Sequence, residues 1–525
     1  MNRLLPRAAI AALSGLGMML VCPPIGLRHL LWVIFVPALL VMRPGEHRNN
    51  ALIGYAAGWT MLAANFFWLA DTVVIFSSLP YIASVLVVVI FATFFALPYL
   101  LVFGSARWLR EHIGVWWVVV VPGLQVAAEH LIPSLFPYYL GGTMYRDPYI
   151  WQVASLTGPT GLTFLALVSN CLIVEGMLRF RSGQSQPILA VAALLATIGA
   201  GFGFGAWRRT AVEAQLADAP TIRASILQQS EDMEFRLRES VWDTLSDWVL
   251  LTREVIADKP DLVVWPEGSV LFNPDDDRVY NALGGRSPKQ FFGELVTRGG
   301  FDFLIGGGTI ELHEGTTADG RQRFTAYNSC YGFRRDGAVV GRYDKMVPLP
   351  FGEYLPLADT FPILREIIQG PGNFRAGTEA VTFSASSGDG QVRYTYTTPI
   401  CYEAILSGQM WRMRDADLLL NITNDAWFGD TAAPHLHGML SAAQAVTLGR
   451  PMLRIAYTGV SFVVEPHGQI LYETEPFAEV AEVVEVRLGA VQTGYRSGGF
   501  LFPWIAALVG FSGLIVGRRR SREAR

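Results

Sequence analysis

The stretch TTPICYEAI, residues 397–405, ends a run of residues typical of a β-strand with Cys401 and continues at once with Tyr402 and Glu403. Two interpretations of this cysteine are open. Cysteine is often a small, buried and unreactive core residue, but a cysteine close to a base can also act as a nucleophile. A nucleophile requires the rest of the chain to supply that base and a group that stabilises negative charge on the substrate.

Composition divides the chain into apolar and ordinary parts. Its 525 residues are 51% hydrophobic and 16% charged, whereas a soluble protein carries about 25% charged residues. The deficit lies in 8–207 and 498–517, while 208–495 have the composition of a soluble α/β domain. We therefore predict a polytopic membrane protein with three parts. These are a membrane region (1–207), an extramembrane domain (208–495), and a final span with a basic tail (496–525). The net charge of −4 gives no reason to expect a nucleic-acid partner.

The apolar segments predict about eight membrane spans, since a spanning helix needs about 20 apolar residues. They lie at roughly 8–25, 28–43, 51–71, 79–104, 114–130, 154–177, 187–207 and 498–517. The first two are short for a span. A cleaved signal peptide is an alternative interpretation of residues 1–22, which the large Val21 before Cys22 disfavours.

Arginines predict the orientation of these spans. With the N-terminus inside, the inside segments hold thirteen arginines and the short outside loops hold two, Arg28 and Arg146. Positive residues collect on the cytoplasmic side. Both termini are therefore expected in the cytoplasm, and 208–495 outside it. The inside arginines are Arg3, Arg7, Arg43, Arg48, Arg107, Arg110, Arg179, Arg181, Arg518, Arg519, Arg520, Arg522 and Arg525.

The extramembrane domain alternates strand-like and helix-like segments. Helices are predicted at about 233–256, 287–299 and 432–448. Buried strands flanked by helices favour a layered α/β or α+β sandwich. Some neighbouring strands have no helix between them, so antiparallel pairs are expected. The predicted strands are 222–229, 261–266, 302–308, 327–333, 338–344, 392–401, 417–423 and 461–466.

Three motifs place polar residues at the ends of predicted strands. VVWPEG places Glu267 after a strand, RYDKMVPLPFGEYLPL places Lys345 after another, and PICYEAI places Cys401 after a third. Singly each is weak, because a carboxylate or lysine at a strand end is usually solvated. Together they provide a base for the thiol proton, a cation for an oxyanion, and a nucleophile. In layered α/β sheets, the carboxyl ends of strands are where sites form.

Three other sequence features are weaker evidence for a function. IGGGTI (305–310) lacks the lysine of a phosphate loop, so we predict a tight exit from a strand. His435 and His437 in HLH have no third ligand in sight, and no metal site or other cofactor is expected. Cys330 and Cys401 could form a disulfide in an oxidising compartment, but a nucleophilic Cys401 has to be free.

The motifs resemble the carbon–nitrogen hydrolase (nitrilase) superfamily. WPEG, YDKMVPLPFGEYLPL, PICYE and NITNDAWFGD carry this resemblance. With the membrane segments, the whole chain resembles the bacterial apolipoprotein N-acyltransferase family. The resemblance implies a four-layer αββα sandwich on the outer face of the inner membrane. It implies Glu267 as general base, Lys345 as oxyanion group and Cys401 as nucleophile. Four further residues would support the triad or line its pocket: Glu353, Tyr402, Glu403 and Trp427.

The resemblance also implies a reaction. Cys401 would take an acyl chain from a phospholipid, typically phosphatidylethanolamine, as a thioester. The N-terminal amine of a diacylglyceryl-cysteine apolipoprotein would then accept the chain. Two alternatives remain open: a membrane-tethered amidase or nitrilase that hydrolyses its acyl-enzyme, and a transporter or sensor with an inactive nitrilase-like domain. The presence of Glu267, Lys345 and Cys401 disfavours the last, as does the lack of a buried charge series in the spans.

Overall fold

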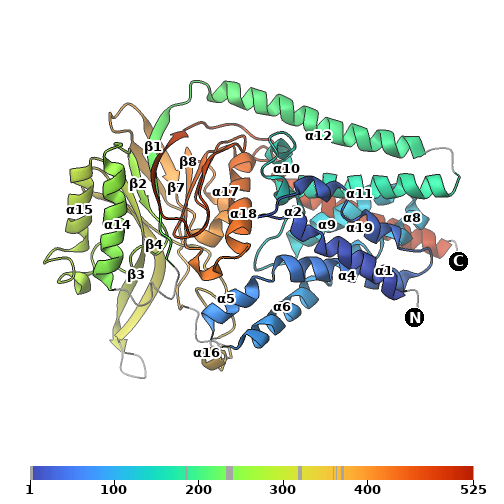
Figure 1. Ribbon diagram of the computed structural model, residues 1–525, viewed down its shortest axis with the longest axis horizontal. Coiled ribbons are helices and arrows are strands. Elements are labelled where there is room, and N and C mark those ends of the chain that lie inside the picture. The colour runs from blue at the N-terminus through green and yellow to red at the C-terminus, as the bar shows by residue number, and fades with distance from the viewer. Residues whose placement is uncertain are drawn as a thin grey trace. The chain divides into compact units, whose positions relative to one another are not determined.

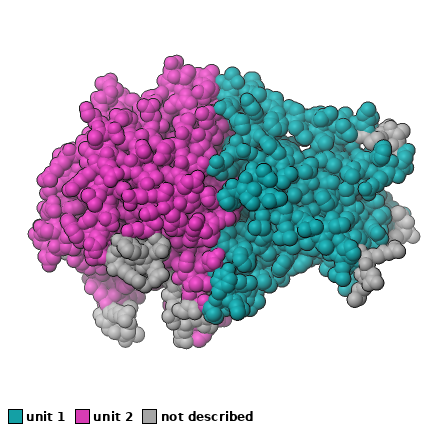
Figure 2. All heavy atoms as spheres, in the orientation of Figure 1, with its two compact units in different colours: residues 1–70, 80–211, 492–525 teal, residues 71–79, 212–491 magenta. Residues whose placement is uncertain are grey.

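The computed structural model describes residues 4–77, 79–183, 187–231, 240–316, 322–358, 360–361, 363–367 and 372–523 (Figure 1). The chain forms two compact units (Figure 2). The first contains residues 1–70, 80–211 and 492–525, and the second contains 71–79 and 212–491. The first unit is helical, and the second holds both β-sheets.

The helices of the first unit are mostly apolar and present many large side chains on their outer faces. Leu86 and Phe94 on α6 and Leu508 on α19 are more than half exposed, as expected for residues that face lipid. The helices are α1 (Leu4–Leu16), α2 (Met18–Val21), α3 (Val36–Leu40), α4 (His47–Asn65), α6 (Tyr81–Phe95), α7 (Tyr99–Val102), α8 (Ala106–Ile113), α9 (Trp117–Leu131), α10 (Ala154–Thr157), α11 (Pro159–Arg181), α12 (Pro187–Leu216) and α19 (Phe502–Glu523), with 3-10 turns η1 (Arg28–Trp32), η2 (Gly114–Trp116), η3 (Leu140–Met144), η4 (Ile150–Val153) and η8 (Gly499–Leu501). Most of α5 (Leu69–Phe76) and the end of α12 belong to the second unit.

Within the described residues, five helical stretches are long and apolar enough to cross a membrane, and a bent pair of helices, α4 with α5, adds a sixth. The five are Leu4–Val21, Tyr99–Leu131, Pro159–Arg181, Ile188–Leu216 and Gly499–Glu523. The predicted segments 28–43 and 79–104 contain the shorter apolar helices Arg28–Leu40 and Tyr81–Phe95. Length therefore supports five or six spans, where the apolar runs of the sequence predicted eight.

The second unit contains two six-stranded sheets. Their strand orders are β12-β1-β2-β3-β4-β5 and β11-β10-β9-β8-β7-β6. In the first sheet β1, β2 and β3 are parallel, and in the second β7, β8 and β9 are parallel. The other pairs are antiparallel. The strands are β1 (Thr221–Gln228), β2 (Leu262–Trp265), β3 (Asp302–Thr316), β4 (Gln322–Phe333), β5 (Val339–Asp344), β6 (Thr382–Ser386), β7 (Arg393–Thr397), β8 (Leu418–Thr423), β9 (Met452–Ala456), β10 (Phe462–Val464), β11 (Ile470–Glu473) and β12 (Val480–Arg487).

Helices cover the outer faces of the two sheets, which gives four layers (Figure 1). On the first sheet, Trp248 of α14 stacks on Trp265 of β2 with ring centroids 5.9 Å apart, and Phe292 of α15 packs edge-on against the same Trp265. Such large aromatic pairs explain why β2 is buried along its whole length. The helices and turns are α14 (Val241–Ile256), α15 (Pro288–Gly299), α16 (Leu364–Ile367), α17 (Ser407–Arg412), α18 (Ala433–Leu448), η5 (Asp277–Val279), η6 (Cys401–Ile405) and η7 (Ala426–Phe428).

Within the described residues, the structure confirms the predicted strands and helices of this domain, although four strands were missed and several ends differ. β4 begins five residues before the predicted 327, and the predicted helix 233–256 is observed as Val241–Ile256, with 233–239 outside the described residues. β6, β9, β11 and β12 were not predicted, because they are short or, in β12, interrupted by glutamates. The glycines of 305–310 do not end a strand, since β3 continues through them to Thr316. The strand before Cys401 ends at Thr397.

Candidate active site

The two sheets bring the three predicted catalytic residues to strand ends. Glu267 lies just beyond β2, and Lys345 directly follows β5. β5 is antiparallel to β4, which is antiparallel to β3, so β5 runs in the same direction as β2. Both residues therefore leave the same edge of the first sheet. Cys401 opens η6 beyond the end of β7 in the second sheet.

Lys345 lies between two carboxylates. Its Nζ is 3.3 Å from Glu267 Oε1 and 2.7 Å from Glu353 Oε2. The side-chain nitrogen of Asn328, on β4, donates to Glu267 Oε1 at 2.7 Å and to Glu353 Oε1 at 2.6 Å. Glu353 also accepts from the backbone N–H of Leu349 at 2.7 Å. One cation, two carboxylates and one amide thus form a closed polar network.

The second sheet also contacts the candidate base. The backbone N–H of Asn424, one residue beyond β8, donates to Glu267 Oε2 at 2.7 Å. Both oxygens of Glu267 therefore accept hydrogen bonds, which fix the orientation of the side chain.

Lys345 is 2% exposed. Burial opposes its charge, but the carboxylates of Glu267 and Glu353 outweigh burial and raise the pKa of Lys345 well above its ordinary value. The side chain is therefore a permanent cation in a dry site. A buried cation of this kind can stabilise an oxyanion strongly, because little water screens its charge.

Cys401 is 7% exposed and has a φ of +52°. This left-handed backbone conformation is uncommon for a residue with a Cβ and persists where the surroundings enforce it. Burial and the negative charge of Glu267 raise the pKa of the Cys401 thiol, while Lys345 lowers it and Asp425 raises it. The resting group is consequently a thiol, and its activation needs a base. All four cysteines of the chain are free, so Cys330 and Cys401 form no disulfide.

Glu403 is completely buried. Its carboxylate accepts hydrogen bonds from the backbone N–H groups of Ile400 (2.8 Å), Met346 (2.7 Å) and Val347 (3.0 Å), and from the hydroxyl of Tyr343 (2.8 Å). These donors come from the turn before the cysteine and from the segment around the lysine. The sequence predicted Glu403 as a residue of the pocket, and in the structure it joins the segment after Lys345 to the turn before Cys401.

The two remaining predicted residues lie close in sequence to the site residues. Tyr402 is 6% exposed, and burial raises the pKa of its hydroxyl to about 12. Trp427 is half-buried in η7, three residues beyond Asn424. The seven residues predicted for the site therefore all lie in the second unit. They are Glu267, Lys345, Glu353, Cys401, Tyr402, Glu403 and Trp427.

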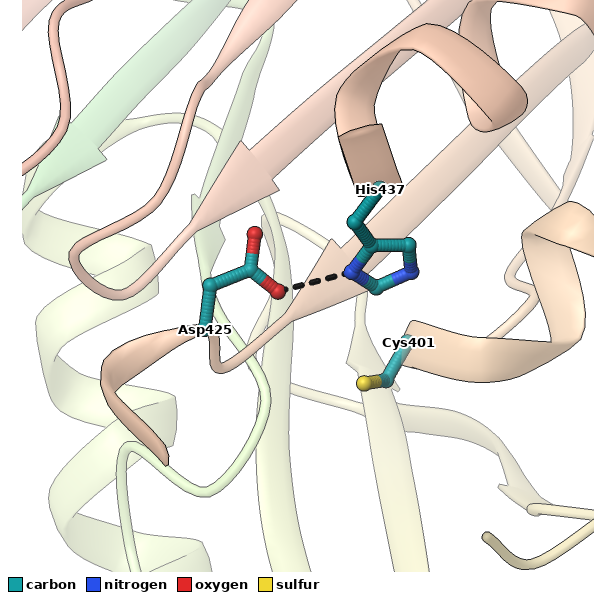
Figure 3. Close-up of side chains that lie close together, drawn as sticks. All are labelled: Cys401, Asp425 and His437. Atoms are coloured by element: carbon teal, nitrogen blue, oxygen red, sulfur yellow. Dashed lines mark hydrogen bonds and ion pairs between the residues drawn. The ribbon is translucent and has the colours of Figure 1, made fainter. Parts of the chain in front are cut away.

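Sequence reasoning missed a second buried network beside Cys401 (Figure 3). His437, on α18, bonds Asp425 through Nδ1 at 2.8 Å, and Arg454 of β9 bonds the other oxygen of Asp425 at 2.7 Å. Sγ of Cys401, one oxygen of Asp425 and one ring nitrogen of His437 all lie within 4.8 Å of one another. The signal in the sequence was an aspartate after a buried strand and a histidine on a mostly apolar helix that carries no charged residue.

The arrangement is suited to acyl transfer through a covalent intermediate. It offers a thiol in a strained turn, a carboxylate base, and a buried cation. Among the described residues, the polar groups around the thiol form two hydrogen-bonded sets, one around Lys345 and one around Asp425.

Comparisons with known proteins identify the family of the chain. Residues 223–495 match the family model of carbon-nitrogen hydrolases, and residues 14–172 match the N-terminal domain of apolipoprotein N-acyltransferases. The apolipoprotein N-acyltransferase of Geobacter metallireducens is 29% identical over 94% of this chain and 92% of its own length. That of Rhizobium meliloti is 30% identical over 89% of this chain and 87% of its own. Among solved structures, the carbon-nitrogen hydrolase from Helicobacter pylori G27 is 16% identical, with a TM-score of 0.38 over 54% of this chain and 95% of that chain.

The fold and the site therefore define a carbon–nitrogen hydrolase domain joined to a set of apolar helices. The match extends from the helical N-terminal part through the catalytic unit. The chain belongs to the apolipoprotein N-acyltransferase family.

Proposed function

We propose that the protein transfers an acyl chain from a phospholipid to the N-terminal amine of a diacylglyceryl-cysteine apolipoprotein. The observation that carries the proposal is the meeting of Glu267, Lys345 and Cys401 at strand ends in a chain of this family. Phosphatidylethanolamine is the proposed donor. Glu267 is the proposed base, Lys345 the oxyanion group and Cys401 the nucleophile.

The first half-reaction makes a thioester. Glu267 takes the thiol proton as Sγ of Cys401 attacks the ester carbonyl carbon. The ammonium of Lys345 and the backbone N–H of Tyr402 stabilise the negative charge on the carbonyl oxygen. As the ester C–O bond breaks, Glu267 returns the proton to the oxygen of the leaving lysophospholipid. Glu353 supports this step by holding Lys345.

The second half-reaction uses the amine of the apolipoprotein. Its nitrogen attacks the thioester carbonyl, the C–S bond breaks, and an amide forms. The product is a triacylated lipoprotein. Both substrates are lipids, which explains why the catalytic unit is part of a chain with apolar helices long enough to span a membrane.

Kinetics test the proposal. Diacyl phospholipid alone should release about one equivalent of lysophospholipid per enzyme and leave an acyl adduct on Cys401, detected by mass spectrometry. A diacylglyceryl-cysteine peptide should then restart turnover, and its N-acetylated form should not. Continued release of fatty acid without an amine would instead indicate a membrane-tethered hydrolase.

We also propose the topology that the arginine distribution favours. The membrane region is 1–207, the catalytic domain 208–495 is periplasmic, and 496–525 form the last span and a cytoplasmic tail in the bacterial inner membrane. A reporter fused after Arg525 should report a cytoplasmic position. The same reporter inserted at Gly315 should report a periplasmic position. Equal behaviour of the two reporters would contradict this topology.

A further inference from the structure

The first unit contains a cavity between its helices. Side chains of α4, α6, α7 and α9 line it, together with the segments that follow α4 and α9. All of these elements belong to the first unit, and α4 packs against α6 (Figure 1). The cavity has a volume of about 60 Å³. One water molecule occupies about 30 Å³ in the liquid, so the cavity admits a small polar group but no whole lipid.

The walls of the cavity are mainly aromatic. The ring centroids of Phe91 and Phe95 lie 4.6 Å apart. Phe66 lies 5.1 Å from Phe91 and meets Tyr138 edge-on at 5.6 Å, and Tyr99 supplies a fifth ring. The faces of aromatic rings carry a negative electrostatic potential and attract cations. The walls therefore favour an occupant that is partly apolar and positively charged.

One carboxylate, that of Glu129, lines the same cavity. It lies in the last turn of α9 and is half-buried. Its Oε1 atom accepts hydrogen bonds from the backbone N–H of Leu140 at 3.0 Å and from the side-chain nitrogen of Gln125 at 3.2 Å. The Thr163 hydroxyl lies 2.9 Å from Oε2 and 3.3 Å from Oε1. These donors fix the carboxylate, and Oε2, with one partner among the described residues, can accept a further hydrogen bond.

The partners of Glu129 among the described residues are all neutral. Glu175, on α11 of the same unit, instead forms ion pairs with Arg110 and Arg179 at 2.6 Å. A carboxylate among membrane helices is costly unless a cation pairs with it. The end of α9 adds to the negative potential, because a helix C-terminus is the negative end of its dipole. The cavity therefore has the electrostatic character of a cation site.

We propose that this cavity binds the primary ammonium of a lipid substrate, with Glu129 as its ion-pair partner, an inference that rests on the proposed function and topology. Arg107 and Arg110 precede α9 in the chain, and the positive-inside rule assigns the start of this helix to the cytoplasmic side. Glu129, at the other end of α9, then lies at the outer edge of the membrane, on the side of the catalytic domain.

Two molecules in the proposed reaction carry a primary ammonium. One is phosphatidylethanolamine, in its headgroup, and the other is the diacylglyceryl-cysteine acceptor, at its α-nitrogen. The α-nitrogen has to lose its proton and reach the thioester on Cys401, whereas the ethanolamine nitrogen takes no part in the chemistry. The donor headgroup is therefore the occupant that we assign to the cavity. A headgroup without a cation, such as that of phosphatidylglycerol, gains no ion pair there, so Glu129 would select the donor by its headgroup.

The test compares phospholipids that differ only in the headgroup. Glu129→Gln keeps the size of the side chain and removes its charge. In mixed micelles, the half-saturating concentration of dioleoyl phosphatidylethanolamine for the lysophospholipid burst should rise about 10-fold, the effect of losing one charged hydrogen bond. The burst rate at saturation should stay unchanged, and the values for dioleoyl phosphatidylglycerol should not rise. Glu111→Gln, which changes a solvent-accessible carboxylate on α8 of the same unit, is the matched control and should behave as wild type with both lipids.

Discharge of the acyl-enzyme separates the two sources of the ammonium. The half-saturating concentration of a diacylglyceryl-cysteine peptide should be the same for Glu129→Gln and wild type. A shift confined to this step would assign the cavity to the acceptor amine and overturn the headgroup assignment. Equal shifts for the two phospholipids would mean that Glu129 only maintains the helices, and no shift in either half-reaction would refute an ammonium site.

A second variant keeps the proposal testable if Glu129→Gln does not fold. Phe95→Leu retains the carboxylate and removes one ring, so it should raise the half-saturating concentration of phosphatidylethanolamine about threefold and leave that of phosphatidylglycerol unchanged. Equal values for the two lipids would contradict the proposal. If wild-type enzyme forms no acyl adduct with either lipid, the proposed function fails, and native mass spectrometry still tests the cavity. Wild type should then retain phosphatidylethanolamine in preference to phosphatidylglycerol, and Glu129→Gln should show no preference.

Discussion

Asn328 holds Glu267 by a 2.7 Å hydrogen bond from its side-chain nitrogen, and the same nitrogen lies 2.6 Å from Glu353. The two carboxylates that neutralise Lys345 are thus joined by one neutral amide. An amide N–H donor between two negative groups reduces their mutual repulsion without adding charge. The position of the base therefore depends on a residue of β4 that is not charged.

Replacing Asn328 with leucine should move the base without changing the charge of the site. Glu267 and Glu353 each lose a donor, and a buried acceptor without a partner costs about 1–3 kcal/mol. We expect the rate of acylation to fall by about 10-fold or more and the melting temperature to drop. The lysophospholipid burst and thermal unfolding measure these effects. Asn281→Leu, at an exposed position, is the control, and an equal loss in both variants would contradict the assignment.

Lys345→Met should be damaging to both stability and activity. It leaves two buried carboxylates without their cation, which costs about 3–5 kcal/mol, and it removes an oxyanion group that contributes about 3 kcal/mol to the rate. The double variant Lys345→Met with Glu353→Gln removes one of the stranded charges. It should recover part of the melting temperature but none of the acylation. Recovery of both would show that Lys345 has only a structural role.

Glu403 should make stability depend on pH. Burial raises the pKa of Glu403 from 4.5 to about 7, although the amide of Ile400 and the charge of Lys345 oppose this rise. Between these values the folded protein binds more protons than the unfolded chain, so the free energy of unfolding falls as pH rises. The integrated effect is about 3 kcal/mol. Glu403→Gln should be less stable at low pH but should lack this decline.

Melting temperatures of wild type and Glu403→Gln, measured from acidic to mildly alkaline pH, provide the comparison. The two curves should approach each other as pH rises. Parallel curves would mean that Glu403 stays ionised in the folded protein.

Gly306 lies where β3 passes the turn that carries the base. A Cβ there would be 2.3 Å from the carbonyl oxygen of Pro266 and 2.7 Å from Cα of Glu267. Both are backbone atoms and cannot rotate away, so Gly306→Ala should displace Glu267 and reduce acylation about 10-fold or more. At Gly308 the nearest atom would be 3.5 Å away. Gly308→Ala should therefore retain activity, and similar burst rates for the two variants would refute the steric argument.

The sequence predicted best the buried strands, because a short continuous run of apolar residues is typical of a strand buried on both faces. Continuous apolar strands predicted the buried β2 and β8. The catalytic roles of Glu267, Lys345 and Cys401, which follow such strands, remain a prediction. β12 was missed because it is an edge strand whose exposed Glu482 and Glu485 break the apolar pattern.

The second network could not be predicted in the same way. His437 lies on α18, far along the chain from Cys401, and contacts Asp425 only because β8 and the helix pack together. Asn328 lies on the antiparallel strand β4. A polar residue on such a strand usually faces solvent, so its contacts with Glu267 and Glu353 were not predicted. The partners of such residues depend on strand register, and a sequence pattern does not determine which residue lies opposite another.

The pairing of β1 with β12 has a consequence for biosynthesis. Ile222 lies opposite Val486, so β1, near the start of the catalytic unit, can pair only after β12, near its end, has been synthesised. Until nearly the whole unit has been made, β1 exposes a free edge that other chains could join. Contacts between residues so distant in sequence also form slowly. The unit should therefore mature late, only after almost all of it has been made, and a chain truncated before residue 480 should aggregate rather than fold in part.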